Sequence, residues 1–164
     1  MPAEPLRVHK RQRLRTREVE DLDAEMKRSW GIAPFPPESA VESGSFDKQD
    51  VIIFKGRIVA FKDGGIVLPT IHLLLSMRPL AKFVTVDMGA VRFVCNGADV
   101  MAPGVVEAEP SIREGEGVWI RDMKNGKPLA VGVALAPGSN MRGSKGKVVR
   151  TLHFVGDRLW GYEA

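Results

Sequence analysis

The stretch VTVDMGAVRFVCNGADVMAPG, residues 84–104, decides the fold and most of the function that the sequence predicts. It predicts the end of a short buried strand, a tight turn, one or two turns of apolar helix and a glycine loop that enters another strand. Three glycines lie beside a helix end in this stretch: Gly89, Gly97 and Gly104. Because glycine has no side chain, backbone can approach a ligand there, and helix N–H groups can face an anion. Because no nucleophile, base or metal ligand clusters there, we expect a binding site without catalytic chemistry.

Further short motifs follow this stretch in a fixed order. They are VD-x-GA at 86–90, GADVMAPG at 97–104, GVWI at 117–120, AVGVA at 130–134 and H-x-x-GD-x-LW at 153–160. With these motifs in this order, residues 82–160 resemble the PUA domain, an RNA-binding module of pseudouridine synthases, archaeosine transglycosylases and translation factors. The whole chain is similar to small two-domain archaeal PUA proteins, which in turn resemble the eukaryotic malignant-T-cell-amplified and ligatin translation proteins.

The resemblance implies a fold and a site. We expect an α+β N-terminal domain at 1–81, followed at 82–164 by a PUA-type small β-barrel with a short helix, mainly β in structure. PUA domains accept RNA, often a duplex end or the CCA tail of tRNA, in a groove between the first helix with its glycine loop and a nearby strand. By matching positions, the RNA contacts fall on Gly97, Ala98, Asp99, Val100, Met101, Pro103 and Gly104, with Lys82 and Arg92 as the nearest cations in sequence. The alternative is that these glycines only form tight barrel corners.

The charge distribution also favours a polyanion. The formal net charge is +4, and residues 123–156 contain six Lys and Arg residues but no Asp or Glu. Such a span can project a field of one sign, although it can also serve only as a solvated face. Its segment 138–150 is predicted to be a loop that leads into a strand. There we expect Arg142, Lys145, Lys147 and Arg150 to neutralise RNA phosphates, unless the loop is merely flexible and solvated.

Composition excludes several classes. The 164 residues, 44% of them hydrophobic, suit one domain or two small ones. No apolar run approaches the roughly 18 residues of a membrane helix, and the basic start lacks a signal-peptide core, so we expect a cytoplasmic protein without a membrane partner. Cys95, the only cysteine, lies in an apolar helical run and is interpreted as a buried, inert thiol. We expect no metal and no cofactor.

The N-terminal half predicts a helix on a small sheet. Residues 1–12 show no periodicity and are interpreted as a mobile basic arm. An apolar stripe from Val19 to Trp30 predicts an amphipathic helix, with Thr16 as its N-cap and Gly31 as its end. An antiparallel meander is expected next, with strands at about 40–44, 51–54, 57–61 and 66–68.

A second helix, IHLLLSM, is expected after this meander, capped by Thr70 and stopped before Pro79. The junction at 80–82 is short and lacks a Gly/Ser-rich linker, so the two halves should be rigidly docked. His72 and His153 are interpreted as structural. Trp119 and Trp160 are expected in the core, whereas the place of Tyr162 stays open.

Catalysis is not expected. The chain has no HExxH, GxSxG, Walker or CxxC motif, and the first 80 residues are too few for a synthase or transglycosylase domain. The resemblance implies a non-catalytic RNA binder that acts on tRNA or rRNA, with the small ribosomal subunit or a translation factor as a further partner, in initiation or recycling. Two alternatives stay open: an accessory RNA-binding subunit in tRNA modification, and a protein-interaction scaffold without RNA.

Overall fold

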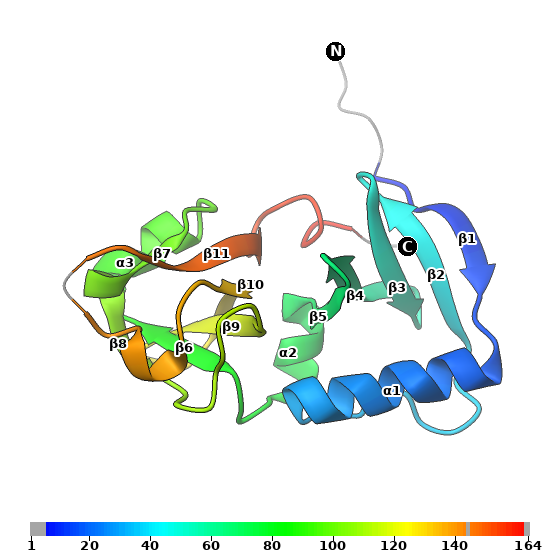
Figure 1. Ribbon diagram of the computed structural model, residues 1–164. Helices are drawn as coiled ribbons and strands as arrows, with labels where there is room; N and C mark the ends of the chain where they lie inside the picture. Colours follow the sequence, from blue (N-terminus) through cyan, green and yellow to red (C-terminus); the bar gives the residue numbers. More distant parts are fainter. Residues whose placement is uncertain (1–5, 144, 163–164) are drawn as a thin grey trace, which may run out of the picture.

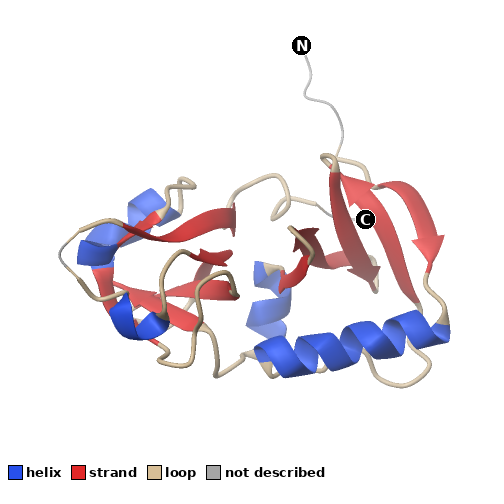
Figure 2. Cartoon of the chain, in the orientation of Figure 1, coloured by secondary structure: helices blue, strands red, loops and turns tan. Residues whose placement is uncertain are grey.

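The structure, a computed structural model, describes residues 6–143 and 145–162. It contains two β-sheets, and helix α2 (Ile71–Met77) lies between them (Figure 1). Strands form the body of both halves, and the helices lie at their margins (Figure 2). Within the described ranges, no helix is long and apolar enough to cross a membrane.

The first sheet is antiparallel and has the strand order β1-β2-β3-β4-β5. Its strands are β1 (His9–Arg13), β2 (Val41–Phe46), β3 (Gln49–Phe54), β4 (Arg57–Asp63) and β5 (Ile66–Pro69). Strands β2 to β5 form the predicted meander. Gly56 closes the β3–β4 turn at φ +75°, and Gly64 and Gly65 close the β4–β5 turn at φ +55° and +84°, conformations that glycine adopts without strain.

Strand β1 contradicts the expectation of a mobile basic arm at 1–12 for residues 9–12. Its residues are all exposed, and it pairs with β2 at the sheet edge, His9 opposite Ser45 and Arg13 opposite Glu42. HKRQR contains no apolar residue, so it produces no hydrophobic period, and its partner strand follows only after helix α1 (Thr16–Trp30). Residues 1–5 of the expected arm lie outside the described residues.

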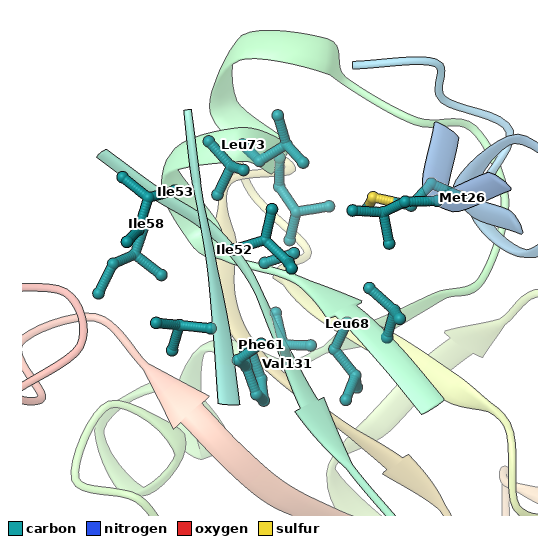
Figure 3. Close-up of a cluster of buried hydrophobic side chains, with 14 of the residues drawn as sticks. Met26, Ile52, Ile53, Ile58, Phe61, Leu68, Leu73 and Val131 are labelled. Atoms are coloured by element: carbon teal, nitrogen blue, oxygen red, sulfur yellow. The ribbon is translucent and has the colours of Figure 1, made fainter. Parts of the chain in front are cut away.

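Helix α1 covers the first sheet with the predicted stripe, which is Val19, Leu22, Met26 and Trp30. Its N-cap is Arg15 rather than Thr16, and the Arg15 N–H donates to the Glu18 carboxylate at 3.0 Å. Gly31 ends the helix at φ +71°, as predicted. In Figure 3 the Met26 side chain points toward Ile52 and Leu68 of the sheet.

The second sheet is nearly closed into a barrel, with strand order β7-β11-β10-β9-β6-β8. Its strands are β6 (Phe83–Val86), β7 (Val100–Met101), β8 (Val105–Ala108), β9 (Gly117–Asp122), β10 (Pro128–Ala134) and β11 (Lys147–Phe154). Helix α3 (Met88–Val94) and the short 3₁₀ helices η1 (Ala102–Gly104) and η2 (Gly138–Asn140) lie between strands. This half is therefore mainly β, which agrees with the small barrel expected from the PUA resemblance.

The two halves share a hydrophobic core. The buried cluster of the first sheet also contains Trp119, Val131, Leu159 and Tyr162 from the C-terminal half, and Figure 3 shows Val131 beside Phe61. The Trp119 indole N–H also donates to the Ala81 carbonyl at 2.8 Å, across the junction between the halves. The halves are therefore packed directly on one another, as the missing linker predicts.

His153 fixes strand β11 to helix α2. The side chain is completely buried, and its Nε2 accepts the Ile71 N–H at 3.1 Å. Its Nδ1 lies 2.9 Å from the Asp157 carboxylate, which identifies the neutral imidazole with its proton on Nδ1. Asp157 also accepts the N–H groups of Phe154 and Trp160. His153 is structural, as predicted.

The C-terminal segment 157–162 continues this contact. The His72 ring stacks on Trp160, with ring centroids 4.2 Å apart, and the His72 Nε2 lies 3.0 Å from the Trp160 carbonyl oxygen. Trp160 is half-buried, whereas Tyr162 is buried and packs edge-on against Phe46. The last residues thus tie the second sheet back to the first.

Candidate nucleic-acid interface

A groove of about 780 Å³ lies between helix α3, the glycine loop, strand β7 and helix η1. In Figure 1, α3 and β7 lie at the end of the second sheet that is remote from α1. The groove is lined by Asp87, Gly89, Ala90, Phe93, Val94, Gly97, Ala98, Asp99, Val100, Met101, Pro103, Gly104 and Lys147. The structure therefore brings together every loop residue that the resemblance assigned to RNA contact, together with one of the predicted cations.

Two of the glycines are required by packing. A Cβ at Gly97 would lie 2.8 Å from the Phe154 ring, and Gly97 has φ +89°. A Cβ at Gly104 would lie 3.0 Å from the Ala90 Cβ, so this glycine lets the loop approach α3. Gly89 differs, since its Cβ would meet only the Asp87 carboxylate, at 3.4 Å. Packing alone is therefore a sufficient reason for glycine at Gly97 and Gly104, whereas the contacts around Gly89 do not require one.

The first turn of α3 already contains a carboxylate. The Asp87 side chain caps the helix and accepts the Ala90 N–H at 2.9 Å. One of the helix N–H groups that could face an anion is therefore bonded to a carboxylate of the chain itself.

Phe93 is the groove residue that the sequence interpretation missed. Its side chain is 56% exposed on α3, and Met101 on the facing strand is 46% exposed. A phenylalanine is seldom this exposed to solvent, and its ring offers a flat surface on which a base can stack. Helical spacing could have indicated this residue, because Phe93 lies four and three positions after Gly89 and Ala90 and so shares a helix face with them.

The predicted cations divide into two groups, of which the first lies at the groove. Lys147 lines it, and its Nζ lies 3.3 Å from Asp99 Oδ2. Arg142 and Lys145 are exposed in the neighbouring loop, which is anchored to η1 by the Ala102 N–H and the Gly146 carbonyl at 2.8 Å. Among the described residues, neither of these two has an ion-pair partner.

The remaining predicted cations do not line the groove. Lys82 Nζ is 2.8 Å from Glu116; burial opposes ionisation of that carboxyl, but the hydrogen bond from Lys82 keeps its pKa below the usual value. Arg150 contacts Asp63 of the first sheet at 3.0 Å. Arg92 is exposed on α3 outside the groove lining, with its guanidinium 5.1 Å from the Phe93 ring centroid.

Cys95, expected to be buried, is half-buried next to α3. Burial, with a smaller contribution from the Asp122 carboxylate, raises the pKa of its thiol. A protonated thiol is a poor nucleophile, in agreement with the inert thiol that the sequence predicts. Across residues 6–143 and 145–162, no group of three or more His, Cys, Asp and Glu side chains is arranged to hold a metal ion.

Comparison with known proteins identifies the barrel. Residues 82–156 match the model of the PUA domain. The uncharacterized protein MJ1432 of Methanocaldococcus jannaschii is 36% identical over 96% of this chain and 99% of its own length. The chain belongs to the PUA-domain proteins. The crystal structure of the hypothetical protein PH0734.1 from Pyrococcus horikoshii superposes on this PUA-domain protein with a TM-score of 0.83 at 30% identity, over 94% of this chain and 99% of that one.

A further relative is named for the translation machinery. Translation machinery-associated protein 20 of Saccharomyces cerevisiae is 27% identical over 71% of this chain and 68% of its own length.

Proposed function

We propose that this PUA-domain protein is a non-catalytic cytoplasmic RNA-binding protein that acts in translation initiation or recycling. Its RNA is tRNA, the small ribosomal subunit or both. In this proposal residues 82–164 form the RNA-binding domain and residues 1–81 a second α+β domain that docks onto the subunit or onto a translation factor.

The composition of the groove carries the proposal. The groove lining combines the exposed Phe93 ring and Gly89, both on α3, with the loop from Gly97 to Gly104, where the glycines leave backbone accessible. Unpaired RNA bases bind proteins by stacking on aromatic side chains and by hydrogen bonds to backbone. The exposed Arg142 and Lys145 lie in the adjoining loop, where they can neutralise phosphates of the strand that leads into the groove.

Filter binding with full-length protein tests the proposal. Intact tRNA should bind with an affinity that falls steeply as salt rises, and removal of the 3′ CCA should weaken binding. Gly89→Leu adds bulk to the groove wall at a position where a Cβ meets no atom closer than 3.4 Å, so it should weaken binding while the protein stays folded. Ser76→Leu also introduces an exposed leucine on a helix, but on α2 and outside the groove lining, and it should bind as wild type.

Sedimentation separates the alternatives. A translation factor should co-sediment with purified small ribosomal subunits and be released at high salt. An accessory subunit of a tRNA-modifying enzyme should bind tRNA without co-sedimenting. A scaffold should do neither, and that result together with salt-independent or absent tRNA binding would contradict the proposal.

A further inference from the structure

The groove contains an unusual electrostatic arrangement for an RNA site. Among its lining residues, the only cation is Lys147, whereas Asp87 and Asp99 are both carboxylates. Asp87 is occupied as the cap of α3. Asp99 faces Lys147, with 3.3 Å between Oδ2 and Nζ. The cation of the groove is therefore already paired within the chain.

The two partners are held very differently. Asp99 Oδ1 accepts the Thr151 N–H at 3.0 Å, and the Thr151 hydroxyl donates to the neighbouring Ala98 carbonyl at 2.9 Å. The Asp99 side chain is 27% exposed. These bonds fix the carboxylate to β11 whether or not Lys147 is present.

Lys147, in contrast, has a side chain that is 62% exposed, on the first residue of β11 and opposite Met101 in the β7–β11 register. A lysine stem with this exposure can swing its ammonium group toward another anion at little cost. The pair thus consists of a fixed acceptor and a movable donor.

We propose that the Asp99 carboxylate competes with RNA phosphate for Lys147. Asp99 holds Lys147 in an ion pair that the RNA must displace. This inference rests on the proposed function of the groove and assigns Asp99 a role different from RNA contact. When a phosphate approaches, Lys147 exchanges one anionic partner for another, so its net contribution to binding is small. The pair lowers affinity for any polyanion, and binding then depends more on the fit of bases in the groove.

The proposal predicts that loss of the Asp99 charge strengthens RNA binding. Asp99→Asn keeps an oxygen that can accept the Thr151 N–H, so the loop should hold its place. Affinity should rise by about twofold to fivefold, the range of an exposed ion pair. The salt dependence should become steeper by up to about 0.7 in the slope of log K against log salt, because Lys147 then provides a full phosphate contact.

A double-mutant cycle shows whether Asp99 acts through Lys147. In a Lys147→Met background, Asp99→Asn should raise the RNA affinity much less than it does in the wild-type background. An equal gain in both backgrounds would mean that Asp99 repels RNA directly, which contradicts the proposal. Glu107→Gln is the matched control, since Glu107 is an exposed acid of the same sheet paired with Arg121 at 3.8 Å, and it should bind as wild type.

The two proposals fail differently. If wild-type protein binds no RNA, the proposed function is wrong. If wild type binds tRNA and Asp99→Asn binds with unchanged or weaker affinity at equal thermal stability, only the competitor role is wrong. A variant with a lowered melting temperature is replaced in the cycle by Asp99→Ser, which removes the same charge and keeps an acceptor oxygen.

Discussion

Strand β11 has two ends of opposite character. At its start, Lys147 lines a groove in which Phe93 and Met101 expose apolar surface. At its end, His153 is completely buried and both of its ring nitrogens have partners. A buried polar group with all its bonds made specifies one arrangement, whereas exposed apolar surface remains available to a ligand. We therefore expect substitutions at the end of β11 to change stability and substitutions at its start to change affinity.

The largest expected effect tests the buried end. His153→Ala removes the acceptor of the Ile71 N–H and the donor to Asp157, and it leaves a cavity between β11 and α2. The free energy of unfolding should fall by about 2–4 kcal/mol, measured by urea denaturation. His9→Ala, on the exposed strand β1, is the matched control and should change it by less than about 0.5 kcal/mol. An unchanged urea midpoint for His153→Ala would show that the contact between the halves does not depend on this residue.

The groove end should respond in affinity instead. Phe93→Ala removes the exposed ring on which a base is proposed to stack, and tRNA affinity should fall by about 1–3 kcal/mol. The melting temperature should change little, because Phe93 is 56% exposed. Met88→Ala removes a side chain of similar exposure, 48%, from the same helix but outside the groove lining. Equal losses for the two variants would mean that Phe93 acts as general apolar surface rather than as a stacking partner.

The sequence predicted the elements that carry their own local signal. Helix α1 follows the stripe from Val19 to Trp30, and Gly31 ends it. The meander from β2 to β5 follows alternating apolar residues and glycine turns. Strand β1 was missed because HKRQR has no apolar residue, and because its partner strand, which it contacts through backbone pairing and the Arg11–Glu42 ion pair, lies about thirty residues away in the chain. Pairing of this kind leaves no pattern in a single sequence.

The site was predicted in part for the same reason. The glycine loop was found because its motif is contiguous, from Gly97 to Gly104. Cations could not be assigned by proximity in sequence: Lys82 adjoins the first barrel strand but pairs with Glu116, and Arg150 contacts Asp63 of the other sheet. Which side of a strand a charge faces depends on register, and tertiary pairing sets the register.

Charge reversal at the groove loop is expected to have a smaller effect than loss of Phe93. Arg142→Glu with Lys145→Glu should weaken RNA binding without changing the melting temperature, because both residues are exposed. The salt slope should fall by about 1.4, or about 0.7 for each lost phosphate contact. Lys124→Glu with Lys127→Glu reverses two exposed cations of the same acid-free segment, on the β9–β10 turn, and is the control. If both double variants weaken binding equally, net charge rather than the groove loop attracts RNA.

The smallest expected effect is a pH dependence of stability that arises at the end of β11, where Asp157 contacts His153. Burial of Asp157 works against its ionisation, but hydrogen bonds from His153 and from the N–H groups of Trp160 and Phe154 outweigh it and hold its pKa below the ordinary value of 3.8. A carboxyl with a lowered pKa in the folded state contributes stability that is complete above its ordinary value and is lost as the pH falls through the folded pKa. Urea denaturation of wild type should therefore show a loss of stability below about pH 4.

Asp157→Asn isolates this contribution. Burial opposes ionisation at Glu116 and Asp122 too. The hydrogen bond from Lys82 nevertheless keeps the pKa of Glu116 low, and four backbone N–H groups keep that of Asp122 low. Wild type should therefore lose stability in acid from several carboxyls at once. The variant should be less stable than wild type at pH 7, and the difference between the two should shrink as the pH falls. A difference that stays constant with pH would assign the role of Asp157 to its shape and hydrogen bonds rather than to its charge. Neutral hydrogen bonds and packing would then hold this end of β11 in place, as they already do for the uncharged His153 imidazole.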